Sequence, residues 1–280
     1  MSYINEFELK NIVKQALAED IGRVDITSNA FIPAHKKAKA RIISKENFVI
    51  CGLYVAGLVF KIQDKKIKFR PCVKDGDLVK KGKILAEISG RARSILAAER
   101  VALNFLSLLS AIATKTHKFV DAVKGYKARI IDTRKTIPGL RILEKYAVRI
   151  GGGFNHRFSL DEMFLVKDNH LKIIGGIKNL KPIKRRYILE IEVKNLREFK
   201  QALLLNPDMI MLDNMKINDM RQAVKIRNNL SSKFFLPPRL EASGNVTLKN
   251  VRKIAATGVD LISIGSLTHS IDSVDISLEV

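Results

Sequence analysis

Residues 132–170 read DTRKTIPGLRILEKYAVRIGGGFNHRFSLDEMFLVKDNH, and this stretch carries most of the information about the fold. Short apolar runs in and around it stop at small or polar residues typical of loops, with cationic side chains beside them. Arg offers a planar fork that matches a carboxylate or phosphate, and Lys offers a compact point charge. If the fold brings them together, such side chains form a pocket for a ligand with several negative charges. They are Arg134, Lys135, His156, Arg157 and Lys167.

The same alternation of an apolar run and a polar end continues outward from this stretch. Helical patterns, such as NLREFKQALLL and KINDMRQAVKIRNNL, lie between the runs. Strands that alternate with helices indicate βα units and a parallel sheet. Polar residues at six strand ends favour a βα-barrel, incomplete or modified, over an open doubly wound sheet, which binds ligands mainly at one switch point. The six runs are ARIID (128–132), MFLVKD (163–168), YILEIEV (187–193), MIMLDN (209–214), RLEASG (239–244) and DLISIGS (260–266).

The first hundred residues have a different pattern. Residues 5–20 have helical spacing, and residues 53–62 predict a second helix. Around them, the short runs AKARIIS, NFVICG, KIKFRPCV and DLVKKGKILAEISG, punctuated by Gly and Asp, predict a small antiparallel sheet. The run at 73–90 also suggests a biotinyl or lipoyl carrier domain. Because no Lys is displayed at a hairpin tip there, a hairpin of a β-sandwich is favoured.

We therefore expect an α/β protein with two domains. Residues 1–110 are expected to form an N-terminal α/β sandwich domain, and residues 111–269 a βα-barrel catalytic domain. The DISLEV run inside the last segment, 270–280, is expected to return and pair with the N-terminal sheet. A helix starting at Ala98 is apolar over most of its circumference. Its apolar stretch is too short to span a bilayer, so we expect a buried helix and no membrane association.

The formal net charge is +22, and it needs an explanation. The basic clusters are scattered along the chain without forming a tail, tryptophan is absent and aromatic residues make up 6%. Solvated lysine faces are therefore favoured over a nucleic-acid-binding surface, which stays the alternative of a different class. The two cysteines, Cys51 and Cys72, lie outside any C-x-x-C pattern. With no signal-peptide pattern at the start, they fit a cytoplasmic protein.

Phosphate and metal chemistry is indicated at the later strand ends. The motifs GxGxxG and GxxxxGK[ST] are absent, which excludes Rossmann and P-loop sites. Ser243-Gly244 and Gly265-Ser266 end the last two strands, where small residues let backbone N–H groups approach a phosphate. Glu192 and Asp213 lie at the ends of the two strands that precede these in the sequence. These two acids could hold ribose hydroxyls and a Mg²⁺ bridged to pyrophosphate, although solvated loop acids are the commoner case.

The chain resembles quinolinate phosphoribosyltransferases, the decarboxylating enzymes of NAD biosynthesis, over nearly its whole length. The likeness rests on DTRKT-x-PGLR-x-LEKYAV, GGGFNHR and KDNH in the centre. ALAEDIG-x-x-DIT and AERVALNFL-x-x-LS-x-IAT precede these motifs, and IEV, MLDNM, LEASG and ISIGSLTHS follow. The resemblance implies transfer of phosphoribosyl from phosphoribosyl pyrophosphate to quinolinate, with loss of CO₂. The products would be nicotinate mononucleotide and pyrophosphate.

The resemblance also implies residue roles. Quinolinate would be held by Arg134, His156, Arg157 and Lys167, together with Arg100 from a neighbouring subunit of a homodimer or an assembly of dimers. Catalysis would fall to Lys135, Lys167, Glu192 and Asp213. Mg²⁺ would sit at Glu192 and Asp213, bridged to the substrate pyrophosphate. Phosphoribosyl pyrophosphate would lie across Lys135, Glu192, Asp213, Ser243, Gly244, Gly265 and Ser266.

Three positions depart from the family pattern. Val24 and Asn245 stand where Gly is common, and Ile137 stands where Thr is frequent. Asn245 bears on the phosphate loop, although Asn tolerates positive φ better than most residues. The nearer alternative is a relative on the same scaffold that acts on another anionic acceptor, or a nicotinate-type transferase without decarboxylation. The pairing of Arg134 with His156-Arg157, suited to two carboxylates, favours quinolinate.

Overall fold

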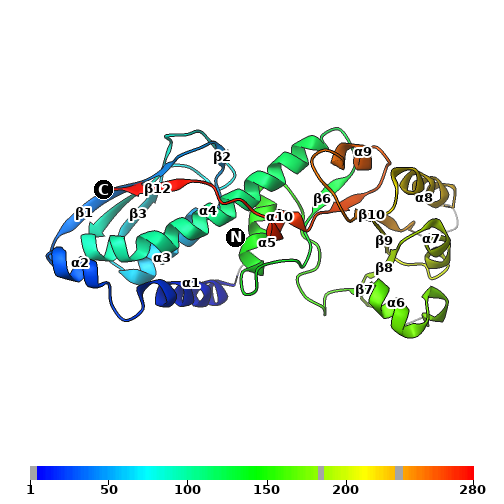
Figure 1. Ribbon diagram of the computed structural model, residues 1–280, viewed down its shortest axis with the longest axis horizontal. Helices are drawn as coiled ribbons and strands as arrows, with labels where there is room; N and C mark the ends of the chain where they lie inside the picture. The colour runs from blue at the N-terminus through cyan, green and yellow to red at the C-terminus, as the bar shows by residue number, and fades with distance from the viewer. Residues whose placement is uncertain (1–4, 182–185, 231–235) are drawn as a thin grey trace. The chain divides into compact units, whose positions relative to one another are not determined.

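The computed structural model describes residues 5–181, 186–230 and 236–280 and divides into two compact units (Figure 1). Unit 1 comprises Met1–His117, Thr136–Gly152 and Leu267–Val280, and unit 2 comprises Lys118–Lys135 and Gly153–Ser266. Unit 1 contains a four-stranded sheet and a two-stranded sheet, and unit 2 contains a six-stranded sheet. Unit 2 holds every predicted site residue except Arg100, which belongs to unit 1.

Unit 1 contains the predicted small antiparallel sheet, in the order β12-β1-β5-β3. The C-terminal strand pairs antiparallel with β1, with Ile42 opposite Leu278, which confirms the predicted return of the DISLEV run. The predicted helices at 5–20 and 53–62 are confirmed. The elements are α1 (Glu6–Ile21), α2 (Ile26–Phe31), β1 (Lys37–Ser44), β2 (Phe48–Val49), α3 (Leu53–Gln63), β3 (Lys68–Pro71), β4 (Leu78–Val79), β5 (Ile84–Arg91) and β12 (Ile276–Glu279).

Side chains at helix starts explain where two of these helices begin. Asn5 precedes α1, and its side-chain oxygen accepts a hydrogen bond from the Phe7 N–H. Asp25 precedes α2 and accepts from the Ser28 N–H in the same way. Each cap satisfies one of the backbone donors that the first turn of a helix leaves without a partner.

The helix expected to begin at Ala98 begins earlier. The helix α4 runs from Ala92 to Ala122 and follows β5 directly, because no Pro or helix-breaking Gly separates the strand from the helix-forming residues after it. By length and composition α4 could cross a membrane. However, most of the apolar part of α4 is buried inside the structure. The core helix of a soluble protein can have the same length and composition, so they are weak evidence for a membrane span.

The glycines of the GGG motif let α4 and α5 (Arg141–Ile150) approach closely. Gly151 follows α5, and a Cβ at this position would overlap the Ala113 carbonyl oxygen and the Thr116 side chain of α4. Gly152 has a φ of 88°, which L side chains rarely adopt. The motif therefore serves the packing of unit 1 at its first two positions.

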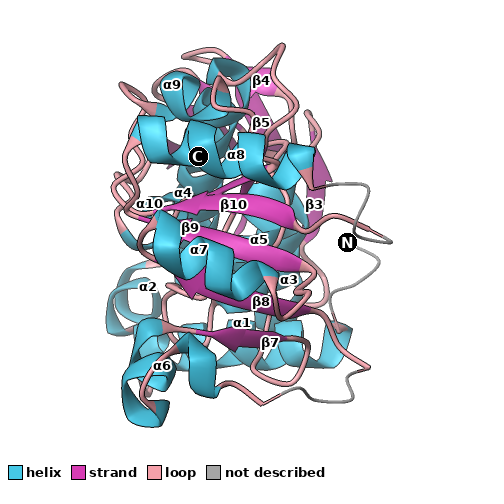
Figure 2. Ribbon diagram, turned by 90° about the vertical axis from the view of Figure 1, so that its right-hand side faces the viewer, coloured by secondary structure: helices cyan, strands magenta, loops and turns pink. Residues whose placement is uncertain are grey.

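Unit 2 contains six parallel strands in the order β6-β11-β10-β9-β8-β7, and all six predicted runs are confirmed. Figure 2 shows the sheet from the side where α6, α7 and α8 cover it. A parallel bridge from Ile131 to Phe154 extends the β6 edge. The elements are β6 (Arg129–Ile131), β7 (Phe164–Val166), α6 (Asp168–Ile174), a short 3₁₀ helix (Ile177–Asn179), β8 (Leu189–Val193), α7 (Leu196–Leu203), β9 (Met209–Asp213), α8 (Ile217–Asn229), β10 (Arg239–Ser243), α9 (Val251–Ala255), β11 (Leu261–Ser263) and α10 (Ser266–His269).

One face of this sheet carries an apolar cluster with acids in register beside it. Ile131, Met163, Met209 and Leu261 form the cluster, with Phe154 packed against it. The register places Glu190 opposite Met209 and Glu241 opposite Leu261. Because side chains alternate along a strand, Glu192, Asp213 and Ser243 lie on the same face, closer to the strand C-termini. The predicted site therefore gathers at the C-terminal edge of one face.

Candidate active site

A buried aspartate ties the end of β6 to the loop at 153–157. Asp132 has no exposed surface, and its Oδ1 accepts a hydrogen bond from the His156 N–H at 2.9 Å. Its other oxygen accepts from the Asn155 side-chain amide. The Asp132 N–H in turn donates to the Phe154 carbonyl at 3.1 Å. Two half-buried donors on this loop therefore depend on one buried carboxylate, which fixes the position of the backbone at His156.

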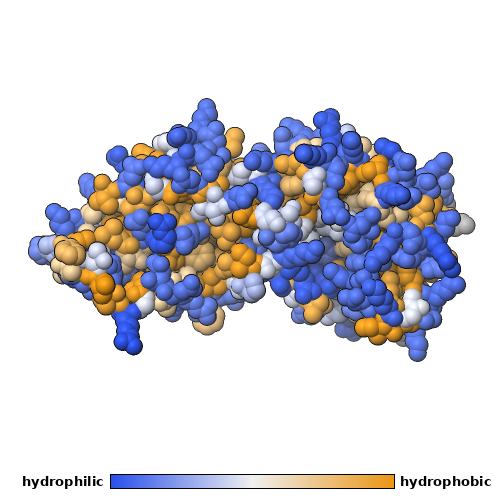
Figure 3. All heavy atoms as spheres, viewed as in Figure 1, coloured by the Kyte–Doolittle hydropathy of each residue, from blue (hydrophilic) through white to orange (hydrophobic). Residues whose placement is uncertain are grey.

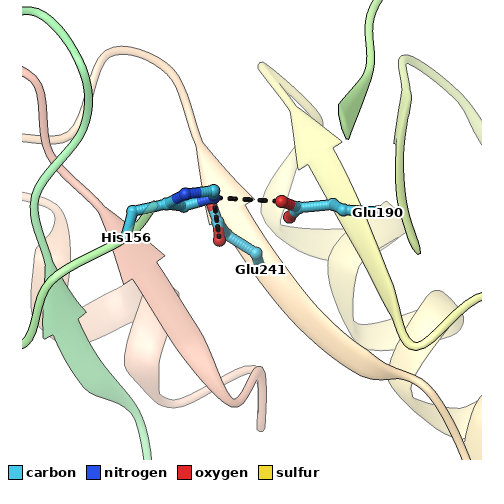
Figure 4. Close-up of side chains that lie close together, drawn as sticks. All are labelled: His156, Glu190 and Glu241. Atoms are coloured by element: carbon cyan, nitrogen blue, oxygen red, sulfur yellow. Dashed lines mark hydrogen bonds and ion pairs between the residues drawn. The ribbon is translucent and has the colours of Figure 1, made fainter. Parts of the chain in front are cut away.

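The imidazole of His156 lies against two buried glutamates. Figure 4 shows the ring pointing toward Glu190 of β8, with Glu241 of β10 beside the ring. His156 Nε2 lies 3.0 Å from Glu190 Oε2 and 3.7 Å from Glu241 Oε2. The other ring nitrogen, Nδ1, accepts a hydrogen bond from the Arg157 N–H at 2.7 Å. Both ring nitrogens are thus engaged by the protein.

The two glutamates are strongly perturbed acids. Both have no exposed surface. Burial raises the pKa of Glu190 to about 7 and that of Glu241 to about 8, and the Glu190 carboxylate adds to the rise at Glu241. Neither glutamate is a predicted site residue: Glu190 lies within the predicted strand at 187–193, and Glu241 lies within the motif LEASG.

Arg157 presents a guanidinium that is only partly used by the protein. Its side chain is 9% exposed, and Nη1 donates to the Met163 carbonyl at 2.8 Å. Its Nε is buried and has no hydrogen-bond partner within the described residues. Burial lowers the pKa of Arg157, and the positive charge of Arg134 lowers it further. Two cations therefore lie close together, and one of them keeps a donor for a ligand.

Lys167, Glu192 and Asp213 meet at the next strand ends. Burial raises the pKa of Glu192, the Asp213 carboxylate raises it further, and the Lys167 ammonium opposes the rise. Lys167 is exposed and precedes α6, where its N–H donates to His170 Nδ1 at 2.9 Å. His170 therefore caps the start of α6. Asp168 instead bonds Lys172 and Lys194, which lower its pKa to about 2.

The phosphate loop predicted after β10 has left-handed backbone at two residues. Ser243 lies opposite Asp213 in the register. Gly244 has a φ of 92°, and a Cβ there would overlap the Asn214 side chain. Asn245 has a φ of 49°, and its Nδ2 donates to Asn214 Oδ1 at 2.9 Å. Asn thus adopts the positive φ for which Gly is common at this position. Gly265 and Ser266 follow β11 and are half-buried.

Two predicted site residues are more peripheral. Lys135 is exposed in the turn after β6, where its N–H donates to Thr133 Oγ1 at 3.1 Å. Arg100 lies on an exposed position of α4 in unit 1. Every other predicted residue lies at or just beyond a strand of the unit 2 sheet, or in the loop at 153–157 that adjoins β6.

Comparison with known proteins gives one consistent family. Residues 112–279 match the model of the quinolinate phosphoribosyl transferase C-terminal domain, and residues 25–110 match that of the N-terminal domain. A protein of Synechocystis named probable nicotinate-nucleotide pyrophosphorylase [carboxylating] is 41% identical over 273 residues, 96% of this chain and 91% of the relative. A protein of Methanocaldococcus jannaschii with the same name is 41% identical over 283 residues, 99% and 98% of the two chains.

Solved structures agree in fold. The nicotinate-nucleotide pyrophosphorylase from Francisella tularensis superposes with a TM-score of 0.90 at 38% identity, covering 99% of this chain and 97% of that chain. The enzyme of the same name from Ehrlichia chaffeensis has a TM-score of 0.90 at 40% identity, and 99% of each chain is covered. The chain belongs to the quinolinate phosphoribosyltransferase family.

Proposed function

We propose that this protein is a quinolinate phosphoribosyltransferase. It would transfer the phosphoribosyl group of phosphoribosyl pyrophosphate to quinolinate and release CO₂, giving nicotinate mononucleotide and pyrophosphate for NAD synthesis. Family membership supports this activity. The observation that carries it is a continuous set of neighbouring charges: Arg134 lowers the pKa of Arg157, and Lys167 lowers the pKa of both Glu190 and Glu192. Asp213 in turn raises the pKa of Glu192.

The cationic side would bind the pyridine dicarboxylate. A buried guanidinium without a full set of partners favours an anion, because a charge out of water is costly unless it is paired. The unpartnered Nε of Arg157 could form half of a bidentate contact with one carboxylate. Arg134 and Lys167 lie close enough to this region to influence the charges of Arg157 and Glu190, respectively. They would neutralise the second carboxylate.

The acidic side would bind the ribose and a Mg²⁺. The Asp213 carboxylate raises the pKa of Glu192, so the two acids repel one another and a divalent cation between them would relieve that repulsion. Magnesium commonly takes one or two carboxylates together with substrate phosphate. When bound, it would neutralise charge on the pyrophosphate leaving group. Ser243, Gly244, Gly265 and Ser266 would offer backbone N–H groups to phosphate oxygens.

The protein would contribute to the reaction by orienting the two substrates and neutralising their charges, without a covalent nucleophile. The C1–O bond to pyrophosphate would break through an oxocarbenium-like state, with Lys135 and Lys167 neutralising the departing oxygens. The pyridine nitrogen would attack C1, which leaves the ring cationic. The C–C bond to the adjacent carboxylate can then break, because the cationic ring accepts the electron pair. A proton on the resulting carbanion completes nicotinate mononucleotide. Holding both substrates in line accounts for much of the rate.

We further propose that the enzyme works as a homodimer or an assembly of dimers, with Arg100 completing a neighbour's site. Arg100 is exposed on α4, and unit 1 also exposes Phe7, Ile26 and Phe31, to 72%, 75% and 82%. Figure 3 shows apolar residues at the position of α2. Exposed apolar side chains that gather on one surface are typical of surfaces that associate, and Ile26 and Phe31 both lie on α2. Both cysteines are free, which fits a reducing cytoplasm.

Complementation tests the assembly. At a low quinolinate concentration, Arg100→Ala and Arg157→Ala should each have little activity, and mixing them should restore part of it, because one site of a hybrid dimer keeps both arginines. Mixing each variant with itself is the control. If subunits demonstrably exchange and no activity returns, Arg100 does not act in a neighbouring site.

The activity can be tested by incubating the protein with Mg²⁺, phosphoribosyl pyrophosphate and each of three acceptor molecules. Quinolinate should give pyrophosphate and product. Nicotinate, with one carboxylate, should bind weakly and turn over poorly. Benzene-1,2-dicarboxylate keeps both carboxylates and lacks the ring nitrogen, so it should bind and not react. Preferential turnover of nicotinate would instead support the non-decarboxylating alternative. Removing Mg²⁺ should lower turnover, and unchanged turnover in a chelator would exclude the proposed metal role.

A further inference from the structure

The hydrogen bonds around His156 assign its tautomer. The Arg157 N–H is a donor and points at Nδ1 from 2.7 Å, so Nδ1 must offer its lone pair. In a neutral imidazole the proton then resides on Nε2. Nε2 faces Glu190 Oε2 at 3.0 Å, an acceptor at hydrogen-bond distance. The geometry is therefore that of a neutral ring with Nε2–H donating to Glu190.

More hydrogen-bond acceptors than donors lie around Nε2, because the carboxyl groups of Glu190 and Glu241 both face it. Glu241 Oε2 lies 3.7 Å from Nε2, beyond a hydrogen bond but close enough to act as a second acceptor after a small rotation. Both oxygens of Glu241 and Oε1 of Glu190 are buried without a hydrogen-bond partner among the described residues. A ring nitrogen that faced an ionised Glu190 without its own proton would place lone pair against lone pair. With Glu190 ionised, the carboxylate therefore favours a proton on Nε2 as well.

A bound cation is the competing explanation of the cluster. One ligand atom from each of His156, Glu190 and Glu241 lies within 4.8 Å of the others, close enough for a shared ion. Metal ligation through Nε2 needs the lone pair of that nitrogen and moves the ring proton to Nδ1. That proton would point at the Arg157 N–H, donor against donor. The hydrogen-bond geometry therefore favours a proton over a metal at Nε2.

We propose that Glu190, with Glu241 behind it, is a positioning residue that holds His156 as the Nε2–H tautomer and so fixes Arg157 for quinolinate. His156, which the resemblance places among the residues that hold quinolinate, then acts on it through Arg157. The mechanical link is short: Asp132 holds the His156 N–H, His156 Nδ1 holds the Arg157 N–H, and Arg157 Nη1 is held by Met163. The inference rests on the proposed function, since it names quinolinate as the anion at Arg157.

Three variants separate positioning from a general structural role. Glu190→Gln keeps an oxygen that can accept from Nε2–H, whereas Glu190→Ala removes it. Glu19→Gln makes the same change as the first variant at an exposed position of α1 in unit 1 and serves as the matched control. Calorimetry should show quinolinate affinity reduced about tenfold or more in Glu190→Ala, about 1.4 kcal/mol, and largely restored in Glu190→Gln. Phosphoribosyl pyrophosphate affinity should not change. Equal losses for both ligands, or no loss, would overturn the proposal.

The tautomer can be read independently of substrate. Nitrogen-15 spectra of the His-labelled protein at pH 7, assigned by comparison with His156→Gln, should show an unprotonated Nδ1 and a protonated Nε2 for His156. A proton on Nδ1, or on both nitrogens, would overturn the proposal. So would one equivalent of Zn²⁺ or Mn²⁺ bound without substrate and lost in Glu190→Ala. Because this readout needs no turnover, it still decides the tautomer if the protein proves inactive on quinolinate.

Discussion

Replacing Glu241 by Gln should make the protein's stability less dependent on pH. Burial raises the pKa of Glu241 from 4.5 to about 8, so the folded chain keeps a proton that the unfolded chain releases in this range. For an acid whose pKa is raised on folding, the free energy of unfolding falls as pH rises from the unfolded to the folded pKa. The slope approaches about 1.4 kcal/mol per pH unit and is smaller near pH 5, where the unfolded acid is not fully ionised, so the fall from pH 5 to pH 7 is about 2 to 3 kcal/mol.

Gln has nearly the same shape and never ionises, so Glu241→Gln should lack this contribution. Urea unfolding of both proteins at pH 5 and pH 7 gives two differences in unfolding free energy. The variant should gain about 2 to 3 kcal/mol relative to the parent between the two pH values, while any constant effect of the amide cancels. The same comparison for Glu19→Gln is the control and should show no such gain. A difference for Glu241→Gln that stays constant from pH 5 to pH 7 would refute a buried neutral acid at this position.

Three further substitutions test other parts of the site. Asp132→Asn places an amide donor against one of the two loop donors. The free energy of unfolding, measured with urea, should fall by about 1–3 kcal/mol, and the quinolinate KM should rise. Unchanged stability would contradict the role given to Asp132. Gly244→Ala forces a Cβ into the Asn214 side chain at positive φ, so the KM for phosphoribosyl pyrophosphate should rise and that for quinolinate should not; the reverse pattern would exclude this loop as the phosphate site. Arg157→Ala should weaken quinolinate binding roughly 10- to 100-fold in calorimetry and spare phosphoribosyl pyrophosphate; unaltered quinolinate affinity would remove Arg157 from that site.

Much of the unit 2 fold could be predicted from the sequence, because each strand is an apolar run that stops at polar residues. The runs at 128–132 and 239–244 became β6 and β10 in this way. The start of α4 could not be predicted, because the pair Ser89-Gly90, a common turn signal, lies inside β5 and the helix begins directly after Arg91. A boundary of that kind is set by tertiary packing and not by local signals.

The buried acids of the site were beyond sequence reasoning for a different reason. LEIEV places Glu190 and Glu192 on one face of β8, but the letters do not say how deep each lies. Glu190 is fully buried beside His156, a residue 34 positions away, and no local pattern announces such a contact. In contrast, the tolerance of Asn245 for positive φ follows from its side chain alone, and its φ of 49° bears this out.

The most direct test of the proposed activity follows the carbon that should leave. Quinolinate labelled with carbon-13 in the carboxylate next to the ring nitrogen is incubated with the protein, phosphoribosyl pyrophosphate and Mg²⁺, and the label is followed by NMR. We predict that all label in the consumed substrate appears as CO₂ and bicarbonate, with one pyrophosphate and one nicotinate mononucleotide formed for each. Label retained in a phosphoribosylated product, or no product while both substrates bind, would contradict the proposed function.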